Sequence, residues 1–398
     1  MKKGGSKVPG SPRRARSAGW AQGFSLVELM IALLIGLLIT GSMISVFIAT
    51  RTASKTTSGV ASLTDGGRVA LDFLQQGIRS AGFMACNTPA RTVNSVTAGT
   101  SVAATDYVEA LGGYEAVGSD PTTSASTPIS TVSATATSVV AADTSTSGWT
   151  GGLDSMLANQ VVQGSDVLVV HTLLPQTAPN PSTVYLTAPA AVGATTVTVS
   201  AMLGSVTQNP TQLPVVLISN CATSVAVQIR SVAGTTLTLA EGLPTAFGAG
   251  AQVGVADTIA YYIGVDPSSH NSALFALDLQ GMTTATSTGV KNKELVPDIE
   301  NMQILYGIDT TGNQMVTEYV TADQVSSSYT GNFNGVLNVR IAVMAASPLY
   351  AKPANPTRST TPVTTPELLL AGTTVQPPAD TRLRRVFETT VSVRNNGI

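Results

Sequence analysis

The longest apolar segment of the chain lies close to its N-terminus. Between Phe24 and Ala49 a single charged residue, Glu28, interrupts a run of apolar and small side chains. From Leu29 to Ala49 there are 21 residues without a charge. About 20 apolar residues are enough for a helix to cross a bilayer. The pattern therefore predicts a membrane-spanning helix over residues 24–50.

A cleaved secretory signal peptide is the simplest alternative, because basic residues precede the apolar run. The run is longer than the roughly 7–15 apolar residues of an ordinary signal peptide. Cleavage after Ala49 would also place the bulky Phe47 where a small residue is needed, and no cysteine lies nearby to make a lipoprotein. An ordinary signal anchor stays open, but it gives no reason for an acid inside the apolar run.

Residues 51–82 carry a different pattern, with apolar side chains every three or four positions. This spacing predicts an amphipathic helix that continues the first one and packs one face on a core. The apolar positions are Val60, Leu63, Ala70, Leu71, Leu74, Ile78 and Ala81. Gly66-Gly67 interrupts the stripe, and glycine in a helix interior costs about 1 kcal/mol. We therefore expect a bend there, between the membrane half and the domain half.

Beyond residue 82 the pattern predicts short strands separated by Gly, Pro and Asn, as in an antiparallel sheet. The expected strands are Asp166–Thr172, Thr183–Thr187, Thr195–Val199, Val215–Ser219, Val225–Arg230, Thr235–Leu239, Thr258–Val265, Ala273–Leu279, Met302–Ile308, Val336–Ala345 and Val386–Arg394. Residues 119–147 hold 16 Ser or Thr among 29 positions and are expected to form a mobile loop. Residues 351–380 are rich in proline and are predicted to lack regular secondary structure. The fold class is α+β, a long helix followed by a β-rich globular region over 83–398.

Charge divides the chain into two parts. Residues 1–23 hold six basic residues and no acid, and the remaining residues hold 15 basic and 23 acidic side chains. The whole chain carries a net charge of −2, which does not suit a nucleic-acid-binding protein. Basic residues ahead of the span, with only Arg51 and Lys55 close behind it, predict a cytoplasmic N-terminus and a periplasmic head.

Candidate chemistry is sparse, so an enzyme is not expected. The chain holds no Gly-x-Ser-x-Gly elbow and no phosphate-binding Gly-x-x-x-x-Gly-Lys motif. Its two histidines, His171 in a strand and His270 in a turn, do not suffice for a zinc site, and neither metal nor cofactor is expected. Asp309–Asn313 weakly resembles a calcium loop but suits a hairpin turn better. Arg382, Arg384 and Arg385 are expected as solvated charges beside a strand.

The residues around Glu28 resemble a processing signal. The string Gly23-Phe24-Ser25-Leu26-Val27-Glu28 is similar to the signal of type IV pilins and pseudopilins. The resemblance implies a leader of residues 1–23, cleavage by a prepilin peptidase between Gly23 and Phe24, and N-methylation of Phe24. It also implies that Glu28 pairs with the terminal ammonium of a neighbouring subunit during assembly. A carboxylate in an apolar span is costly, so such a partner explains its presence.

Further blocks of sequence narrow the resemblance to PilW-type minor pilins. The matching blocks are Gly67–Leu74, Ile78–Phe83 with Cys86, Asp166–Val170, Leu295–Val296 with Ile299–Gly307, and Arg382–Val391 with Arg394-Asn395. Residues 87–163 match nothing in that family. The resemblance implies a minor pilin of the type IV pilus of a Gram-negative bacterium, first in the inner membrane and then in the pilus. A bulky head suits the tip of a filament better than its shaft.

The implied partners are other minor pilins, the major pilin, the prepilin peptidase and the inner membrane, with a tip adhesin as a further candidate. A priming or tip complex that starts filament growth is the expected setting. Two alternatives stay open: a minor pseudopilin of a type II secretion system, which shares the N-terminal signal, and a surface adhesin anchored by one helix.

Cys86 and Cys221 are the two cysteines of the chain. Both follow the predicted span, and so they are expected in the oxidising periplasm, where disulfides persist. We expect them to form one disulfide that ties the end of the helix to the β region. Two buried free thiols are the alternative, and catalytic use is less favoured because no Cys-x-x-Cys spacing is present.

Overall fold

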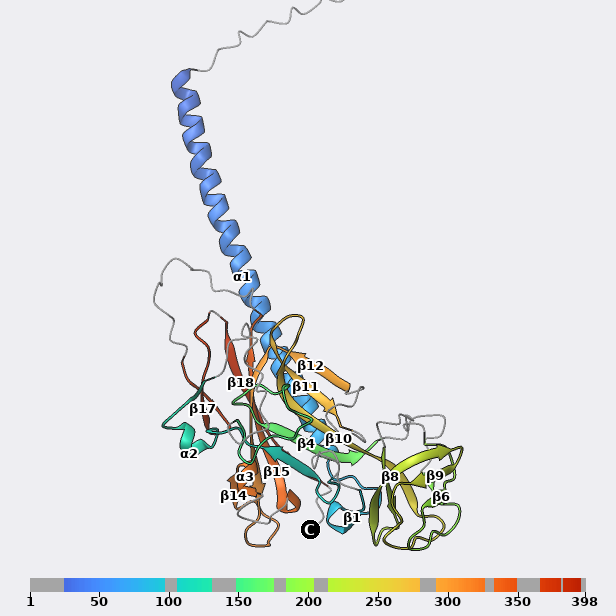
Figure 1. Ribbon diagram of the computed structural model, residues 1–398. Coiled ribbons are helices and arrows are strands. Elements are labelled where there is room, and N and C mark those ends of the chain that lie inside the picture. Colours follow the sequence, from blue (N-terminus) through green and yellow to red (C-terminus); the bar gives the residue numbers. More distant parts are fainter. Residues whose placement is uncertain are drawn as a thin grey trace, which may run out of the picture. The chain divides into compact units, whose positions relative to one another are not determined.

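The computed structural model of the chain describes residues 25–96, 106–130, 148–174, 184–203, 214–279, 291–325, 333–348, 366–380 and 382–394. The chain divides into two compact units, Met1–Ala53 and Ser54–Ile398. Figure 1 labels the helices and strands. One long N-terminal helix is followed by a β-rich region whose strand pairs are mostly antiparallel, which confirms the expected α+β class.

The helix α1 (Leu26–Ser80) is 55 residues long, and its two halves differ in burial. Large apolar side chains from Leu26 to Ile48 are all exposed. In the second half, buried positions recur every three or four residues and include Leu63, Leu71, Leu74 and Ile78. This spacing places them on one helix face, as the sequence pattern predicts.

Gly66 and Gly67 do not interrupt α1, which is helical without a break from Leu26 to Ser80. Gly67 is instead a site of close packing, because a Cβ atom there would overlap the ring of Phe387. At Gly66 a Cβ atom would meet nothing nearer than Val296 Cγ1, at 3.7 Å. The pair therefore does not break the helix, the expected bend stays a prediction, and the contact with Phe387 gives the physical reason for one of the two glycines.

The remaining helical elements are short. They are η1 (Pro89–Arg91), α2 (Pro121–Ser124), α3 (Ala322–Gln324) and η3 (Phe333–Gly335). Asp120 caps α2 by accepting hydrogen bonds from the backbone N–H groups of Thr122 and Thr123. Thr321 and Gln324 form a reciprocal capping box on α3.

The largest sheet has 11 strands. Its members are β1 (Thr92–Asn94), β2 (Leu111–Tyr114), β4 (Val167–Leu173), β5 (Val184–Tyr185), β6 (Thr196–Thr198), β7 (Val215–Ser219), β8 (Ser224–Ala233), β9 (Thr236–Leu239), β10 (Gln252–Val265), β11 (Ser272–Asp278) and β12 (Lys291–Pro297). The 14-residue strand β10 connects the two parts of this sheet. Its first residues pair with β5 and β7, and its later residues pair with β4 and β11.

Two smaller sheets complete the β region. A four-stranded sheet has the order β14-β13-β15-β18, formed by β14 (Glu318–Val320), β13 (Ile299–Ile308), β15 (Val336–Ala346) and β18 (Arg384–Ser392). A three-stranded sheet has the order β16-β17-β3, formed by β16 (Leu368–Leu370), β17 (Thr373–Gln376) and β3 (Ile129–Ser130). β15 pairs antiparallel with β13 on one side and with β18 on the other, over most of its length.

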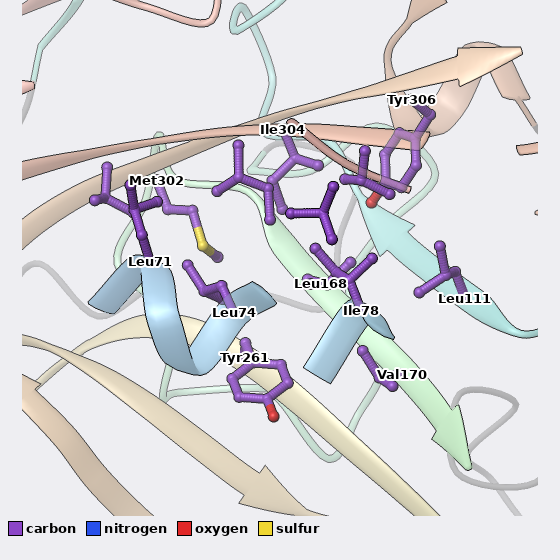
Figure 2. Close-up of a cluster of buried hydrophobic side chains, with 14 of the residues drawn as sticks. Leu71, Leu74, Ile78, Leu111, Leu168, Val170, Tyr261, Met302, Ile304 and Tyr306 are labelled. Atoms are coloured by element: carbon purple, nitrogen blue, oxygen red, sulfur yellow. The ribbon is translucent and has the colours of Figure 1, made fainter. Parts of the chain in front are cut away.

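The main core forms where the second half of α1 meets both larger sheets. Figure 2 shows Leu71, Leu74 and Ile78 of α1 among side chains from four strands. Those labelled are Leu111 of β2, Leu168 and Val170 of β4, Tyr261 of β10, and Met302, Ile304 and Tyr306 of β13. Leu74 and Ile78 are fully buried. The helix therefore supplies one wall of the core rather than lying on its surface.

A second core lies within residues 184–255. Its buried side chains come from β5 to β9 and the start of β10, and include Val216, Ile218, Val225, Leu237 and Phe247. Between Val184 and Val255 the sequence contains two charged residues, Arg230 and Glu241. This module is inserted between β4 and the part of β10 that pairs with β4.

Two stretches differ from the irregular structure expected for them. Within 119–147, residues 121–124 form α2 and residues 129–130 form β3, while residues 131–147 lie outside the described part of the chain. Within 351–380, β16 and β17 form a hairpin that pairs with β3. Ser and Thr content in the first stretch and proline content in the second hid these short elements, of which β3 and β17 pair with each other.

We predict opposite effects for alanine at the two adjacent glycines of α1. Gly67→Ala forces the Phe387 ring to move and should lower the unfolding free energy by about 1–3 kcal/mol, the usual cost of overpacking. Gly66→Ala has room and should raise it by up to about 1 kcal/mol through helix propensity. Unfolding of the full chain in detergent measures both, and equal effects of the two variants would contradict the packing at Phe387.

Candidate functional site

The helix α1 begins at a capped turn that contains Glu28. The backbone N–H of Glu28 donates to Ser25 Oγ at 3.2 Å, and the N–H of Leu29 donates to the Ser25 carbonyl at 3.1 Å. A serine cap with a glutamate three residues later is a common signal for the start of a helix. It was not among the signals that predicted this helix. A carboxylate in the first turn is also favoured by the helix dipole. Glu28 is therefore fixed at the N-terminal end of the apolar helix.

The expected cleavage site lies just before this turn. Gly23 and Phe24 are outside the described residues, which begin at Ser25. Cleavage between them and methylation of Phe24 stay predictions. Glu28 is exposed in the isolated chain, four residues after Phe24. A charged group on a neighbouring molecule could reach its carboxylate without any rearrangement of this chain.

The first half of α1 is an apolar surface that no other described part of the chain covers. Within the described residues, α1 is the one helix that is long and apolar enough to cross a membrane, judged by length and composition. Its large apolar side chains from Leu26 to Ile48 are between 49% and 76% exposed. Such a surface is stable only in lipid or against other apolar helices.

Hydroxyl groups inside this apolar half are satisfied by the helix itself. Thr40 Oγ1 donates to the Gly36 carbonyl at 2.7 Å, and Ser45 Oγ donates to the Ser42 carbonyl at 2.8 Å. Ser42, Thr50 and Thr52 make the same kind of bond to a carbonyl three or four residues earlier. The hydroxyls therefore need no water, and they do not oppose transfer into an apolar medium.

The C-terminal end of α1 is held by β4. The backbone N–H of Gly82 donates to the His171 carbonyl at 2.8 Å, and Thr172 Oγ1 donates to the Ser80 carbonyl at 2.9 Å. The His171 side chain is buried, with Nδ1 2.9 Å from the Glu109 carbonyl and its ring packed edge-on against Tyr107. His171 thus has structural contacts, in line with the sequence expectation, whereas His270 lies exposed in a turn.

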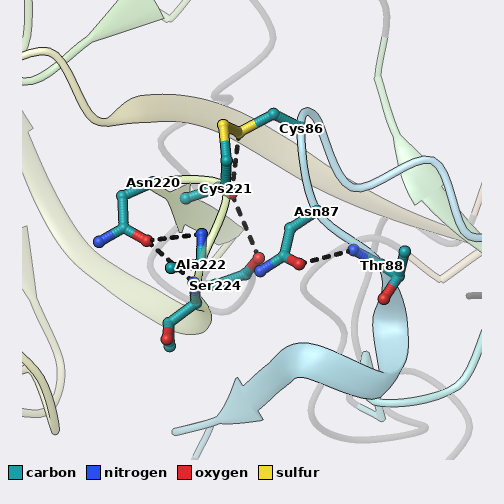
Figure 3. Close-up of a disulfide and its surroundings, with 9 residues drawn as sticks. Cys86, Asn87, Thr88, Asn220, Cys221, Ala222 and Ser224 are labelled. Carbon is teal, nitrogen blue, oxygen red and sulfur yellow. Dashed lines mark hydrogen bonds between the residues drawn. A yellow bond between two sulfur atoms is a disulfide. The ribbon is translucent and has the colours of Figure 1, made fainter.

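A disulfide ties the segment after α1 to the inserted module (Figure 3). Cys86 and Cys221 are bonded, with their Cα atoms 4.9 Å apart and 135 positions apart in sequence. Asn220 Oδ1 accepts hydrogen bonds from the N–H groups of Ala222 and Thr223 and so shapes the turn that presents Cys221. Cys221 itself has a positive φ of 65°. The bridge fits the pairing expected from the sequence.

The expectation of solvated arginines before the last strand is wrong for two of the three. Arg382 and Arg384 are almost completely buried and form ion pairs with acids of the β12–β13 turn. Arg382 Nη2 lies 2.5 Å from Asp298 Oδ1, and Arg384 Nε lies 2.6 Å from Glu300 Oε2. Burial opposes the charge of Arg384, but Asp380 and Glu300 outweigh it, so its pKa is raised. Arg385 is exposed, as expected.

This ion-pair cluster joins segments that are far apart in sequence. Arg382 Nε also donates to the Ser347 carbonyl at 2.6 Å, so one guanidinium contacts the end of β15 and the start of β13. Removing one member of a buried ion pair leaves the other charge unpaired, which is strongly destabilising. The cluster therefore fixes the start of β18 against its neighbours.

A second buried polar cluster holds two carboxyl groups. Asp166 accepts hydrogen bonds from the N–H groups of Ala116 (3.0 Å) and Ile304 (2.8 Å), and Ser119 Oγ lies 2.5 Å from Glu115 Oε1. Burial raises the pKa of Asp166 to about 7, although these hydrogen bonds act in the opposite direction. Burial and the charge of Asp166 also hold the pKa of Glu115 well above its usual value. A cavity of about 370 Å³ borders Glu115.

The sequence Asp309–Asn313 forms the start of a hairpin turn, as favoured over a calcium loop. The Asp309 carboxylate accepts hydrogen bonds from the N–H groups of Thr311, Gly312 and Gln314. Its oxygens are thus occupied by the backbone of its own turn between β13 and β14. Among the described residues, no three His, Cys, Asp or Glu side chains gather as metal ligands.

Residues 260–395 match the family described as Type IV Pilus-assembly protein W. This match confirms the resemblance to PilW-type proteins, and the family implies involvement in type IV pilus assembly. A comparison with curated proteins gave no match.

The matched residues run from the second half of β10 to just beyond β18, about a third of the chain. The blocks at Ile299–Gly307 and Arg382–Val391 fall inside this region. The blocks at Gly67–Leu74 and Asp166–Val170 lie outside it, as do the inserted module and the disulfide.

We predict that the head is more stable at mildly acidic than at mildly alkaline pH. The raised pKa values of Asp166 and Glu115 mean that the folded chain holds protons that the unfolded chain releases above pH 4. The stability that these two carboxyls contribute is therefore full below the unfolded pKa and is lost as pH rises through about 7, by about 1.4 kcal/mol per pH unit for each extra proton held.

Glu115→Gln removes one of the two carboxyl groups while keeping an acceptor for Ser119. The fall in unfolding free energy between pH 5 and pH 8 should become smaller in this variant. Glu367→Gln, at an exposed position, is the matched control and should keep the wild-type pH dependence. A Glu115→Gln variant with the full wild-type slope would show that the buried carboxyls do not titrate as described.

Proposed function

We propose that this protein is a minor pilin that takes part in type IV pilus assembly within a priming or tip complex of minor pilins. The observation that carries the proposal is the helix α1, exposed and apolar up to Ile48 and built into the head core from Leu63 onward. A helix of this kind can leave the membrane and enter a helical bundle without unfolding the head. The PilW match supports the same process.

Processing at Gly23 is part of the proposal. A prepilin peptidase removes residues 1–23, and the new terminal residue Phe24 is N-methylated. The apolar helix stays attached, so the product is held in the inner membrane with its head in the periplasm until it enters the filament. Arg51 and Lys55 are the nearest basic residues after the span, against six before it. This asymmetry favours the proposed orientation.

Glu28 supplies the assembly contact in this proposal. In a bundle of apolar helices, its carboxylate neutralises the terminal ammonium of a neighbouring subunit. Each charge is costly in an apolar medium when alone, and the pair removes both costs. A head of this size, with an inserted module that has its own core, fits a terminal position better than repeated stacking along a shaft. No catalytic step is part of the proposed role.

The processing step predicts a defined N-terminus. Mass spectrometry of the protein purified from its native membrane should find a chain that begins with methylated Phe24. A chain that begins at Met1, or after Ala49, in cells with an active prepilin peptidase would contradict the processing. Replacing Gly23 by a bulky residue should leave the precursor uncut in the same cells.

Deletion of the gene tests the proposed function itself. We expect fewer surface filaments and unchanged secretion of enzymes, because a pseudopilin of a type II secretion system would give the reverse pattern. Returning the wild-type gene should restore the filaments. Filament counts equal to those of the parent strain would refute the proposed role.

Glu28→Ala tests the assembly contact in the same deletion strain. The variant should insert into the membrane and be processed, since removing the carboxylate makes insertion easier. It should restore few filaments, because a neighbour's ammonium loses its partner. Glu28→Asp keeps a carboxylate and should restore more filaments than Glu28→Ala. Equal restoration by alanine and by the wild type would exclude this role for Glu28.

A further inference from the structure

The strand β18 forms one edge of the four-stranded sheet and is long and regular. It pairs with β15 over nine residues, from Arg384 to Ser392, without a register shift. Beyond both ends the ladder continues, since Val393 N–H donates to the Leu337 carbonyl and Ser347 N–H donates to the Leu383 carbonyl. Hydrogen-bonded pairs alternate along an antiparallel ladder. The odd-numbered residues of β18 therefore bond to β15.

It follows that the even-numbered residues direct their backbone groups away from β15. Val386, Glu388, Thr390 and Ser392 each present an N–H and a carbonyl at this free edge. The described part of the chain gives these backbone groups no hydrogen-bond partner. From Val386 to Ser392 the edge is about 20 Å long, at 3.4 Å per residue.

Among the described edge strands, β12, β14 and β6 have features that prevent further pairing, and β18 lacks them. β12 carries Lys291, Lys293 and Glu294, ends at Pro297, and has an irregular register with β11. The edge strands β14 and β6 have three residues each. Charges, prolines, irregular registers and short length are the usual means of preventing edge pairing. Within β18 there is no proline and no register shift, and from Val386 to Ser392 Glu388 is the single charge at an outward-facing backbone position.

We propose that β18 binds an extended segment of another pilus assembly protein, which adds a strand to the four-stranded sheet. Main-chain hydrogen bonds to the even-numbered residues would hold the segment, as in other cases of strand addition. The free edge lies within the region that matches the PilW family. That the partner is a pilus assembly protein rests on the proposed function. That the edge is free rests on the hydrogen-bond pattern between β15 and β18.

The side chains of β18 indicate what kind of segment fits. On one face, Phe387 packs on α1 at Gly67, and Thr389 accepts a hydrogen bond from Gln75 of α1. An added strand should place β-branched or aromatic residues on this face. On the other face Glu388 is 41% exposed and forms an ion pair with Arg340 of β15, at 3.1 Å. A basic residue opposite it on the added strand would share this carboxylate and is favoured.

A second copy of this chain is a poorer occupant. The antiparallel register that pairs all of β18 with itself is centred on Glu388 and places two Glu388 carboxylates opposite each other. Like charges directly opposite in a sheet are destabilising. The expected partner is therefore a different protein of the assembly apparatus.

Site-specific photocrosslinking in living cells tests this proposal. A photoreactive amino acid replaces Ser392 in the full chain, expressed in the deletion strain that it complements. Adducts should map by mass spectrometry to one contiguous segment of a different pilus assembly protein. The same photoreactive residue at Glu318, on the opposite edge of the sheet, is the control and should not label that segment. Adducts to a second copy, or no adducts in cells that bear filaments, would overturn the proposal.

Thr390→Pro removes an outward N–H without removing a bond to β15. The adduct yield from position 392 should fall about tenfold, the change produced by losing ~1.4 kcal/mol of pairing energy. An intact Cys86–Cys221 bridge and a near-normal melting temperature would show that the variant folds. If it does not fold, Ser392→Pro with the photoreactive residue at Thr390 is the equivalent test. An unchanged yield in a folded variant refutes strand addition.

Filament counts separate this inference from the proposed function. If gene deletion lowers the count and Thr390→Pro restores it fully, the assembly role stands and strand addition at β18 is wrong. If gene deletion leaves the count unchanged, the assembly role itself fails, whatever the crosslinking shows about the edge.

Discussion

The structure depends on the packing of one face of α1 against two sheets at once. Leu71, Leu74 and Ile78 contact strands of both the 11-stranded and the four-stranded sheet, so the helix is the element that the two sheets share. Removing it would expose the inner faces of both. The same helix carries the exposed apolar half, and any force or displacement applied there is transmitted to the head through these side chains.

The four-stranded sheet explains one of the two consecutive glycines of α1. The pattern of apolar residues predicts the helix itself. Sequence alone makes the glycine pair look destabilising, because the cost of glycine in a helix is known and the residue that packs beside it in the fold is not. Phe387 lies about 320 residues further along the chain, and its ring fills the space beside Gly67. Sequence spacing cannot reveal such a contact. In this case tertiary packing, not local propensity, determines the residue.

Strands with apolar runs of five or more residues were predictable, and strands that are shorter or of mixed composition were not. Val215–Ser219 is buried along its whole length and its bounds agree with the expected strand. β12, with the sequence Lys-Asn-Lys-Glu-Leu-Val-Pro, and the hairpin of β16 and β17 gave no such signal. The buried arginines show the same limit, because Arg382 and Arg384 depend on Asp298 and Glu300, more than 80 residues earlier. At the candidate site, Ser25 and Glu28 alone are enough to predict the capped turn.

The disulfide between Cys86 and Cys221 has a mechanical consequence. When the chain is pulled between its N-terminal helix and its C-terminal strand, tension passes directly from Cys86 to Cys221 through the sulfur atoms. The residues between them cannot be drawn out, whatever happens to their hydrogen bonds. Fully extended, that loop would add about 450 Å at roughly 3.3–3.6 Å per residue. A covalent bypass of this kind limits how far the protein can lengthen under load. The strands β1 to β7 all lie between the two cysteines and are not stretched.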